Sequence, residues 1–455
     1  MKKDHTPDGR SSVSTAKIIS LVFGGIILAS LFMLLIFSEP LLNRYIAPVI
    51  LKAAAEAYPA YSLHFTEIKY SVLQNRFQFD SVSIRASDGT LSGTINSFSI
   101  REIEWLRWLW GENITLNDFS ASVVEMNDIV LKFPKSGYEF YCEQLHLSVP
   151  DSEMRAEIIE IHPLEGDEEF FRESIFQRTR FRFGARQSTV LDLAVLKILE
   201  GDMVRARFVQ IHDPFLDILV NNDKPVNKKS PSPLMPNEIL SSIDGILQID
   251  SLSITNAQVL YGERLAVGSR PAIIRFDSME VLAEGISNRG ETDAVIDIHA
   301  EGKFQKSGAM SVHLSIPVAS PEFSFKYSGS VHALDLRELN SFLEIAEQMR
   351  VKSGFLQTAS FEVNVLSGQA SGTVRAIYKD LKFVAINKQT GSEHGLFNTI
   401  TSFIANSFTI RSSNVPDKSG AMKVGTIQYS RKQDDPFFRF SWFSIRSGVK
   451  DVVGF

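Results

Sequence analysis

Cysteine is almost absent from this sequence, with Cys142 as the one thiol among 455 residues. A single cysteine cannot form an intrachain disulfide, and it excludes a zinc site built from several thiolates. Basic residues are also outnumbered, because 47 Lys and Arg stand against 53 Asp and Glu and give a net charge of −6. Phosphate binding needs a concentrated basic face, so this balance argues against nucleic acid as a partner.

The common catalytic and nucleotide-binding motifs are missing too. The sequence has no Walker A motif, no G-x-G-x-x-G, no G-x-S-x-G and no H-E-x-x-H. The nine His are scattered, and their closest acidic neighbours are in His212-Asp213 and Asp297-x-His299. We interpret the first pair as a bend between strands and the second as part of the polar face of a strand.

Two further candidates for chemistry have simpler interpretations. The acidic run at 165–169 lacks the ligand spacing of a calcium loop and is interpreted as a solvated loop. Cys142 alternates with Phe140 and Tyr138, which is typical of a small buried residue on a strand. We therefore predict a protein that is not an enzyme and holds no metal and no cofactor.

The sequence has only one long apolar run, at residues 18–37, and this run contains three of the 33 Phe. Residues 18–37 carry no charge over 20 positions, enough to cross a bilayer at ~1.5 Å per residue. Residues 1–17 have a charge of +2, and positive flanks stay in the cytoplasm. We predict a cytoplasmic tail at 1–17 and a single-pass inner-membrane anchor at 18–38, with the remainder in the periplasm. The anchor includes Ile18, Phe23, Leu31 and Phe37.

A cleaved signal peptide is the alternative interpretation of this run. Its apolar region usually spans ~7–15 residues and precedes a small-x-small site. This run is longer and is followed by Ser38-Glu39-Pro40, without such a site. An uncleaved anchor is therefore favoured.

Beyond residue 63 apolar and polar residues alternate with a period of two, which is typical of strands with one buried face. The pattern is clearest at 294–331, where three strands joined by short turns predict an antiparallel meander. Apolar positions of this kind are Phe77, Phe79, Ile296, Ile298, Val312, Leu314, Ile316, Phe323, Phe325 and Tyr327. We predict a mainly β protein with few helices.

Three segments depart from the strand pattern. Residues 41–57 predict a helix, and 396–410 have apolar residues at helical spacing. The second segment is either a core helix or one that docks on a membrane or closes the end of the sheet, and the aromatic tail 437–442 allows the same choice. Residues 221–237, rich in Pro, Asn, Lys and Ser, are predicted as a linker or exposed loop between regions 39–220 and 238–455.

A weak internal repeat joins Trp105–Gly111 to Val195–Gly201, ninety residues later. Each copy is predicted as a short amphipathic turn that ends at a glycine cap before a new strand. Coincidence between two leucine-rich turns remains the other interpretation.

In the order of these features the chain resembles the AsmA-like family of Gram-negative envelope proteins, which includes TamB and YhdP. The N-terminal resemblance lies in the anchor, the following helix, Leu63-His64-Phe65 to Ile84, Trp105–Gly111 and Asp213-Pro214-Phe215-Leu216. The C-terminal resemblance is carried by Gly354-Phe355-Leu356, Gly368-Gln369-Ala370-Ser371-Gly372-Thr373-Val374, Tyr378-Lys379-Asp380-Leu381-Lys382, the segment 396–410, Ser413-Asn414-Val415-Pro416, Arg431 and the tail from Phe437 to Trp442.

This resemblance implies an elongated antiparallel, repeating β-groove that hangs from the inner membrane and carries phospholipid or another acyl-chain lipid. The ten apolar strand positions above are then the groove residues, and the family has no catalytic residues to transfer. About 20 strands at ~4.8 Å each give roughly 100 Å, too short to bridge a periplasm without a partner or an oligomer.

The period-two pattern is compatible with two arrangements of the apolar face. It is either an open groove for acyl chains, which makes the protein a lipid carrier, or the closed core of a sandwich. The closed core is typical of a structural or assembly factor that binds an outer-membrane or periplasmic protein. An outer-membrane barrel is disfavoured by the predicted anchor and helices.

Overall fold

The computed structural model describes most of the chain downstream of the predicted anchor. The described residues are 40, 42–104, 115–201, 203–227, 229, 231–266, 268–290, 294–318, 323–386, 393–394 and 410–454. The predicted anchor at 18–38 and the motif Trp105–Gly111 lie outside them, as does the segment 396–410 except for Ile410. Within the described ranges no helix has the length and apolarity to cross a membrane.

The described strands form one 19-stranded sheet, so the prediction of a mainly β protein is confirmed. In the N-terminal half they are β1 Tyr61–His64, β2 Glu67–Ser71, β3 Arg76–Ala86, β4 Ser92–Arg101, β5 Val123–Phe133, β6 Tyr138–Ser148, β7 Glu153–Pro163, β8 Arg178–Leu191, β9 Met203–His212 and β10 Phe215–Asn221. In the C-terminal half they are β11 Ile246–Arg264, β12 Ala272–Ser287, β13 Val295–Phe304, β14 Gly308–Pro317, β15 Phe325–Asp335, β16 Met349–Leu366, β17 Gln369–Ile386, β18 Glu393–His394 and β19 Val424–Ser430.

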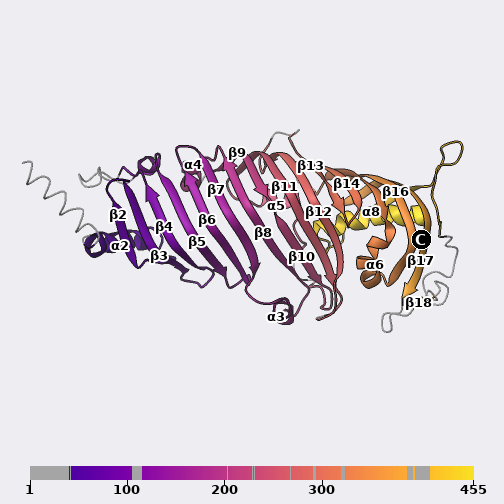
Figure 1. Ribbon diagram of the computed structural model, residues 1–455, viewed down its shortest axis with the longest axis horizontal. Coiled ribbons are helices and arrows are strands. Elements are labelled where there is room, and N and C mark those ends of the chain that lie inside the picture. Colours follow the sequence, from indigo (N-terminus) through magenta and orange to yellow (C-terminus); the bar gives the residue numbers. More distant parts are fainter. Residues whose placement is uncertain are drawn as a thin grey trace, which may run out of the picture.

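Helices are few and short among the described residues. They are η1 Leu42–Ile46, α2 Ala47–Ala57, η3 Leu116–Phe119, α3 Asp167–Arg172, α4 Val195–Glu200, α5 Pro236–Ser241, η4 Leu336–Leu339, α6 Asn340–Ala346 and α8 Phe437–Val453. Figure 1 shows strands following one another along the long axis, with α2 at one end and α8 at the other. η1 and α2 occupy the stretch where a helix is predicted, and α4 ends at Gly201 with φ +82°, the predicted glycine cap before β9.

Neighbouring strands are antiparallel and follow chain order, as short turns between one-faced strands require. β13, β14 and β15 form the predicted meander, with Ile298 opposite Leu314 and Leu314 opposite Tyr327. One junction differs. β9 and β10 lie end to end between β8 and β11, and β11 runs parallel to both.

The residues between β10 and β11 contain most of the predicted linker, whose first residue, Asn221, belongs to β10. A parallel pairing requires the chain to return to the end of the sheet from which β9 started. Residues 222–245 make this return and include α5. The sheet continues through this point without a break, because β10 pairs with β11 over seven residues.

A row of kinks crosses the middle of the sheet from β3 to β12. Ser81, Asp128 and Ile158 have positive φ, and so do Asn256 and Ser278 further along. A residue with positive φ interrupts the extended backbone of a strand and changes the phase of its alternation. On β3 the apolar face therefore passes from Phe77 and Phe79 to Val82 and Ile84 by a step of three, while the strand stays in register with β4. The same side of the sheet stays apolar across the row.

Candidate functional site

The apolar face of the sheet, called the inner face below, is the main feature of the molecule on which a ligand could lie. Across β13 to β16 it is carried by cross-strand sets such as Leu314, Tyr327 and Val363. The opposite, outer face presents polar residues in the same strands, among them His313, Ser328 and Glu362. The two faces differ because successive side chains on a strand point to opposite sides.

At the N-terminal end η1 and α2 cover the inner face. Asn43 of η1 accepts a hydrogen bond from the backbone N–H of Ile68 and donates one to its carbonyl, both at 2.9 Å. Phe65, Ile68 and Val82 are buried here, and the predicted groove residues Phe77 and Phe79 are partly buried against them. The ring centroids of Phe65 and Phe79 lie 5.1 Å apart. These helices therefore close one end of the inner face.

The inner face continues over β4 to β7 with small side chains at its centre. Cys142 and Ala156 are buried between larger residues such as Phe140 and Ile159. Cys142 is thus the small buried residue predicted from its position, and burial raises the pKa of its thiol.

The C-terminal half of the inner face borders a cavity of about 1010 Å³. Its walls come from β8 to β17 and from α6 and α8. The predicted groove residues Val312, Leu314 and Tyr327 line this cavity. Met310, which alternates with Val312 on the same strand, lines it too, and among the lining residues that alternation alone did not single out are Phe183, Leu216, Val259, Phe276 and Phe304.

Most of these side chains are half-buried, so the cavity wall is accessible along much of the sheet. The lining is almost entirely apolar, and its volume matches the upper range of small-molecule pockets, about 300–1,000 Å³. The cavity therefore offers an apolar surface long enough for a flexible hydrocarbon chain, with each buried CH₂ contributing ~0.8 kcal/mol.

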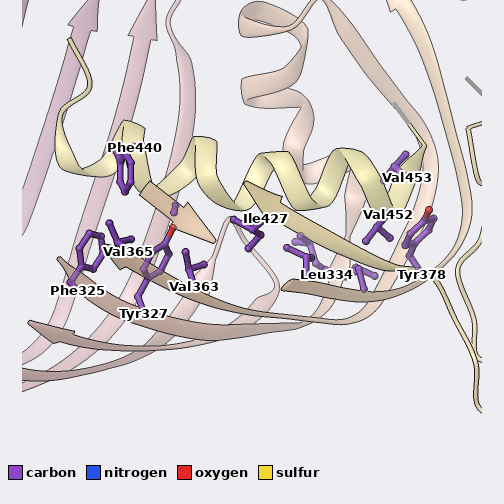
Figure 2. Close-up of a cluster of buried hydrophobic side chains, with 14 of the residues drawn as sticks. Phe325, Tyr327, Leu334, Val363, Val365, Tyr378, Ile427, Phe440, Val452 and Val453 are labelled. Atoms are coloured by element: carbon purple, nitrogen blue, oxygen red, sulfur yellow. The ribbon is translucent and has the colours of Figure 1, made fainter. Parts of the chain in front are cut away.

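The remaining predicted groove residues lie closer to a covered core. Ile296, Ile316, Phe323 and Phe325 are at most 6% exposed, and Ile298 packs against the same cluster. Figure 2 shows Phe440 of α8 above Phe325, Tyr327 and the β16 valines. The centroid of the Phe440 ring lies 5.1 Å from that of Phe323, and the Tyr327 hydroxyl donates to the Ser441 carbonyl at 3.0 Å.

α8 begins with the aromatic tail 437–442, for which the sequence allowed either a core helix or a segment that docks on a membrane or closes the end of the sheet. The helix runs from Phe437 to Val453 and buries Phe440, Val452 and Val453 against the sheet. Gly425 of β19 and Gly448 of α8 permit the approach, because a Cβ at Gly425 would lie 2.0 Å from the Gly448 carbonyl oxygen. The described tail is thus a core helix, and its other face lines the cavity with Trp442, Ile445 and Val449.

Charged side chains line the cavity at one place among the described residues, where α6 ends beside α8. Arg446 and Glu347 form an ion pair at 2.6 Å. Lys450 follows one turn later on α8, and no carboxylate of the described chain lies within 4.0 Å of its ammonium group. Burial lowers the pKa of Lys450, and the positive Arg446 lowers it further.

A second group of polar side chains lies on the outer face. Asp297 contacts the Nε2 atoms of His299 and His313, each at 2.7 Å. The two imidazole rings are stacked with centroids 4.3 Å apart. The adjacent His313, together with His299, holds the pKa of Asp297 below its usual value. Sequence spacing suggests the pair Asp297 and His299, but not His313, which the β13–β14 register places directly opposite His299.

The other two sequence candidates have structural roles. His212 contacts the Thr255 hydroxyl at 2.7 Å and Asp213 has φ +50°, so this pair forms the predicted bend, between β9 and β10. The prediction of a solvated loop at 165–169 is wrong in part, because α3 begins at Asp167. Asp167 pairs with Arg180 at 3.1 Å, and Glu168 pairs with Arg264 at 2.7 Å. Two nearly buried arginines on β8 and β11 require these carboxylates.

Comparison with known proteins does not assign the chain to a group: no protein-family model matches it, and no curated protein matches it.

Proposed function

We propose that this protein binds or conducts phospholipid, or another acyl-chain lipid, along the inner face of its sheet. In this proposal residues 18–38 anchor it in the inner membrane of a Gram-negative envelope, and it supports the lipid balance and integrity of the outer membrane as an AsmA-like protein. The observation that carries the proposal is the apolar cavity of about 1010 Å³ on a sheet whose other face is polar. No catalytic group is required for this activity.

Physical chemistry supports an amphiphile over a rigid small molecule. The cavity wall extends over strands β8 to β17 and has very few polar groups to orient a compact ligand. Soluble monomers rarely expose a continuous apolar surface of this size unless it binds something. A flexible chain that gains ~0.8 kcal/mol per buried CH₂ needs no specific polar contact along its length.

Site-specific crosslinking tests the proposal with a control on the opposite side of the same strand. A photoreactive amino acid at Val312, on the inner face, is expected to crosslink lipid in living cells. The same amino acid at Ser311, which faces outward, is expected to give none. Absence of lipid at Val312, Leu314 and Phe183 together would contradict the proposal.

The second candidate function is an assembly factor for outer-membrane proteins. The covered cores under α2 and α8 favour it, because they bury apolar side chains toward both ends of the sheet. Native mass spectrometry of the full chain separates the two candidates: bound lipid supports the carrier, whereas a stoichiometric protein partner without lipid supports the assembly factor.

A further inference from the structure

The charged end of the cavity is the first feature that goes beyond the proposed function. Glu347, Arg446 and Lys450 line it beside Trp442 and Val449, where hydrocarbon surface meets charge. Because Glu347 pairs with Arg446 at 2.6 Å, the three groups leave one net positive charge when all are ionised. Lys450 carries the ammonium that has no ion-pair partner in the described chain.

We propose that this end binds the phosphate of an anionic lipid headgroup, with Lys450 as its direct contact and the acyl chain extending along the inner face toward β8. Arg446 contributes a second donor, and Glu347 positions it. An ammonium at the edge of an apolar surface can keep its stem in contact with hydrocarbon while its head meets a phosphate. This inference rests on the proposed lipid binding.

Three lipids distinguish the headgroup site from lipid binding in general. Full-length protein in detergent is titrated with phosphatidylglycerol, phosphatidylcholine and diacylglycerol of the same acyl chains. Phosphatidylglycerol is expected to bind about tenfold more tightly than diacylglycerol, and Lys450→Gln is expected to remove most of that difference. Lys326→Gln, a change on the outer face of β15, is the matched control and is expected to alter nothing.

A second variant separates headgroup binding from a merely structural role of these residues, because it is expected to raise the affinity for phosphatidylglycerol rather than lower it. Glu347→Gln frees Arg446 and raises the net charge at the site, so phosphatidylglycerol is expected to bind a few-fold more tightly. Equal binding of phosphatidylglycerol and diacylglycerol, unaltered by Lys450→Gln, overturns the headgroup site but leaves the proposed function in place. Failure of all three lipids to bind contradicts the proposed function. Displacement by millimolar inorganic phosphate assigns the site to free phosphate instead.

A second inference comes from the outer face and does not depend on lipid binding. Asp297, His299 and His313 each offer a ligand atom, and these atoms lie within 4.8 Å of one another. Two imidazoles and one carboxylate are a donor set that binds Zn²⁺. Glu284 stands opposite Asp297 on β12, so two carboxylates face each other on adjacent strands, an arrangement that a bound cation stabilises.

We infer that Asp297, His299 and His313 form a site for a divalent transition metal such as Zn²⁺. Two of the three ligands come from β13 and one from β14, so a bound ion would clamp these strands on the outer side.

Calorimetric titration of the metal-free full chain, without a polyhistidine tag, tests the site with Zn²⁺ itself. We expect one equivalent to bind, and His313→Ala to weaken binding by at least tenfold. His332→Ala, on the outer face of neighbouring β15, is expected to leave the affinity unchanged. No binding at neutral pH, or binding that is equally strong in His313→Ala, overturns the site.

Discussion

At the scale of single residues, the sheet is organised by which side of a strand each side chain occupies and by what pairs with buried charge. Arg264 is 4% exposed and contacts Glu168 at 2.7 Å and the ring of Phe171 at 4.7 Å. A buried guanidinium needs a compensating carboxylate, because desolvation of the unpaired charge is costly. The acidic run that begins α3 supplies it, and this is why α3 lies against β8 and β11 rather than forming a loop in solvent.

Glu168→Gln is therefore expected to destabilise the protein by about 1–3 kcal/mol, because it leaves Arg264 without its carboxylate. Glu169→Gln is the matched control. Glu169 pairs with Arg172 at 3.7 Å on the exposed side of α3, and such surface pairs contribute about 0–1 kcal/mol. Urea unfolding followed by circular dichroism measures both variants, and equal stability for the two would contradict this account.

At the scale of elements, α8 decides how much of the inner face is available. One side of it packs on β17 and β19 through Val452 and Phe440, and another side lines the cavity. Its C-terminal turn is tied to β19 by Asp451, which pairs with Lys423 at 2.7 Å and accepts the Thr426 N–H at 2.9 Å. Arg411 also donates to the last carbonyls of the helix, where positive charge is favourable.

The docking of α8 is expected to weaken in acid. Lys423 and the Thr426 N–H hold the pKa of Asp451 below its usual value. A group with a lowered folded-state pKa contributes stability above its unfolded-state pKa of about 3.9, and that stability is lost as the pH falls through the folded value. Tryptophan fluorescence between pH 6 and 2 reports on Trp442 of α8 when Trp105, Trp108 and Trp110 are replaced by Phe in every protein compared.

Asp451→Asn should remove the part of the acid sensitivity that arises at this helix. Its stability is expected to be lower than that of the wild type at pH 6 and to differ less from it below pH 3. An acid transition in Asp451→Asn identical to that of the wild type would assign the sensitivity to other carboxylates.

At the scale of the whole molecule, one sheet forms a continuous two-sided surface. The nineteen described strands occupy sixteen positions across it, because β1 and β2, β9 and β10, and β18 and β19 each share a neighbour. At ~4.8 Å per position the described sheet is about 77 Å wide. This is shorter than the roughly 100 Å expected from a count of about 20 strands, because strands placed end to end add no width.

A charge in the middle of the cavity wall tests whether the inner face works as one surface. Met310→Asp places a carboxylate on that wall, and a buried unpaired carboxylate repels hydrocarbon. Lipid crosslinking at Val312 is expected to fall at least tenfold. Ala309→Asp, one residue earlier on the outer face, is expected to leave crosslinking unchanged. Similar losses in both variants would indicate misfolding rather than a blocked surface, and thermal melts of both proteins check this.

Much of the sheet is predictable from sequence because the period-two pattern is local. The meander at β13 to β15 follows directly from alternation and short turns. The sequence pattern also indicates the kinks, because the apolar residues Phe79 and Val82 on β3 are three positions apart instead of two. The strand pattern did not identify Phe183 and Phe276 as cavity residues. Alternation shows which face of a strand is apolar, but it does not show which part of that face the helices leave uncovered.

The sequence by itself determined the strand-rich class, the apolar and polar faces and the helix before the sheet, since each depends on residues a few positions apart. Only the tertiary structure decided that α8 covers Phe323 and Phe325 while Val312 and Leu314 line a cavity. It also decided that His313 meets Asp297 and that Arg264 needs α3. These outcomes depend on strand register and on the docking of segments up to about a hundred residues apart, which no local periodicity encodes.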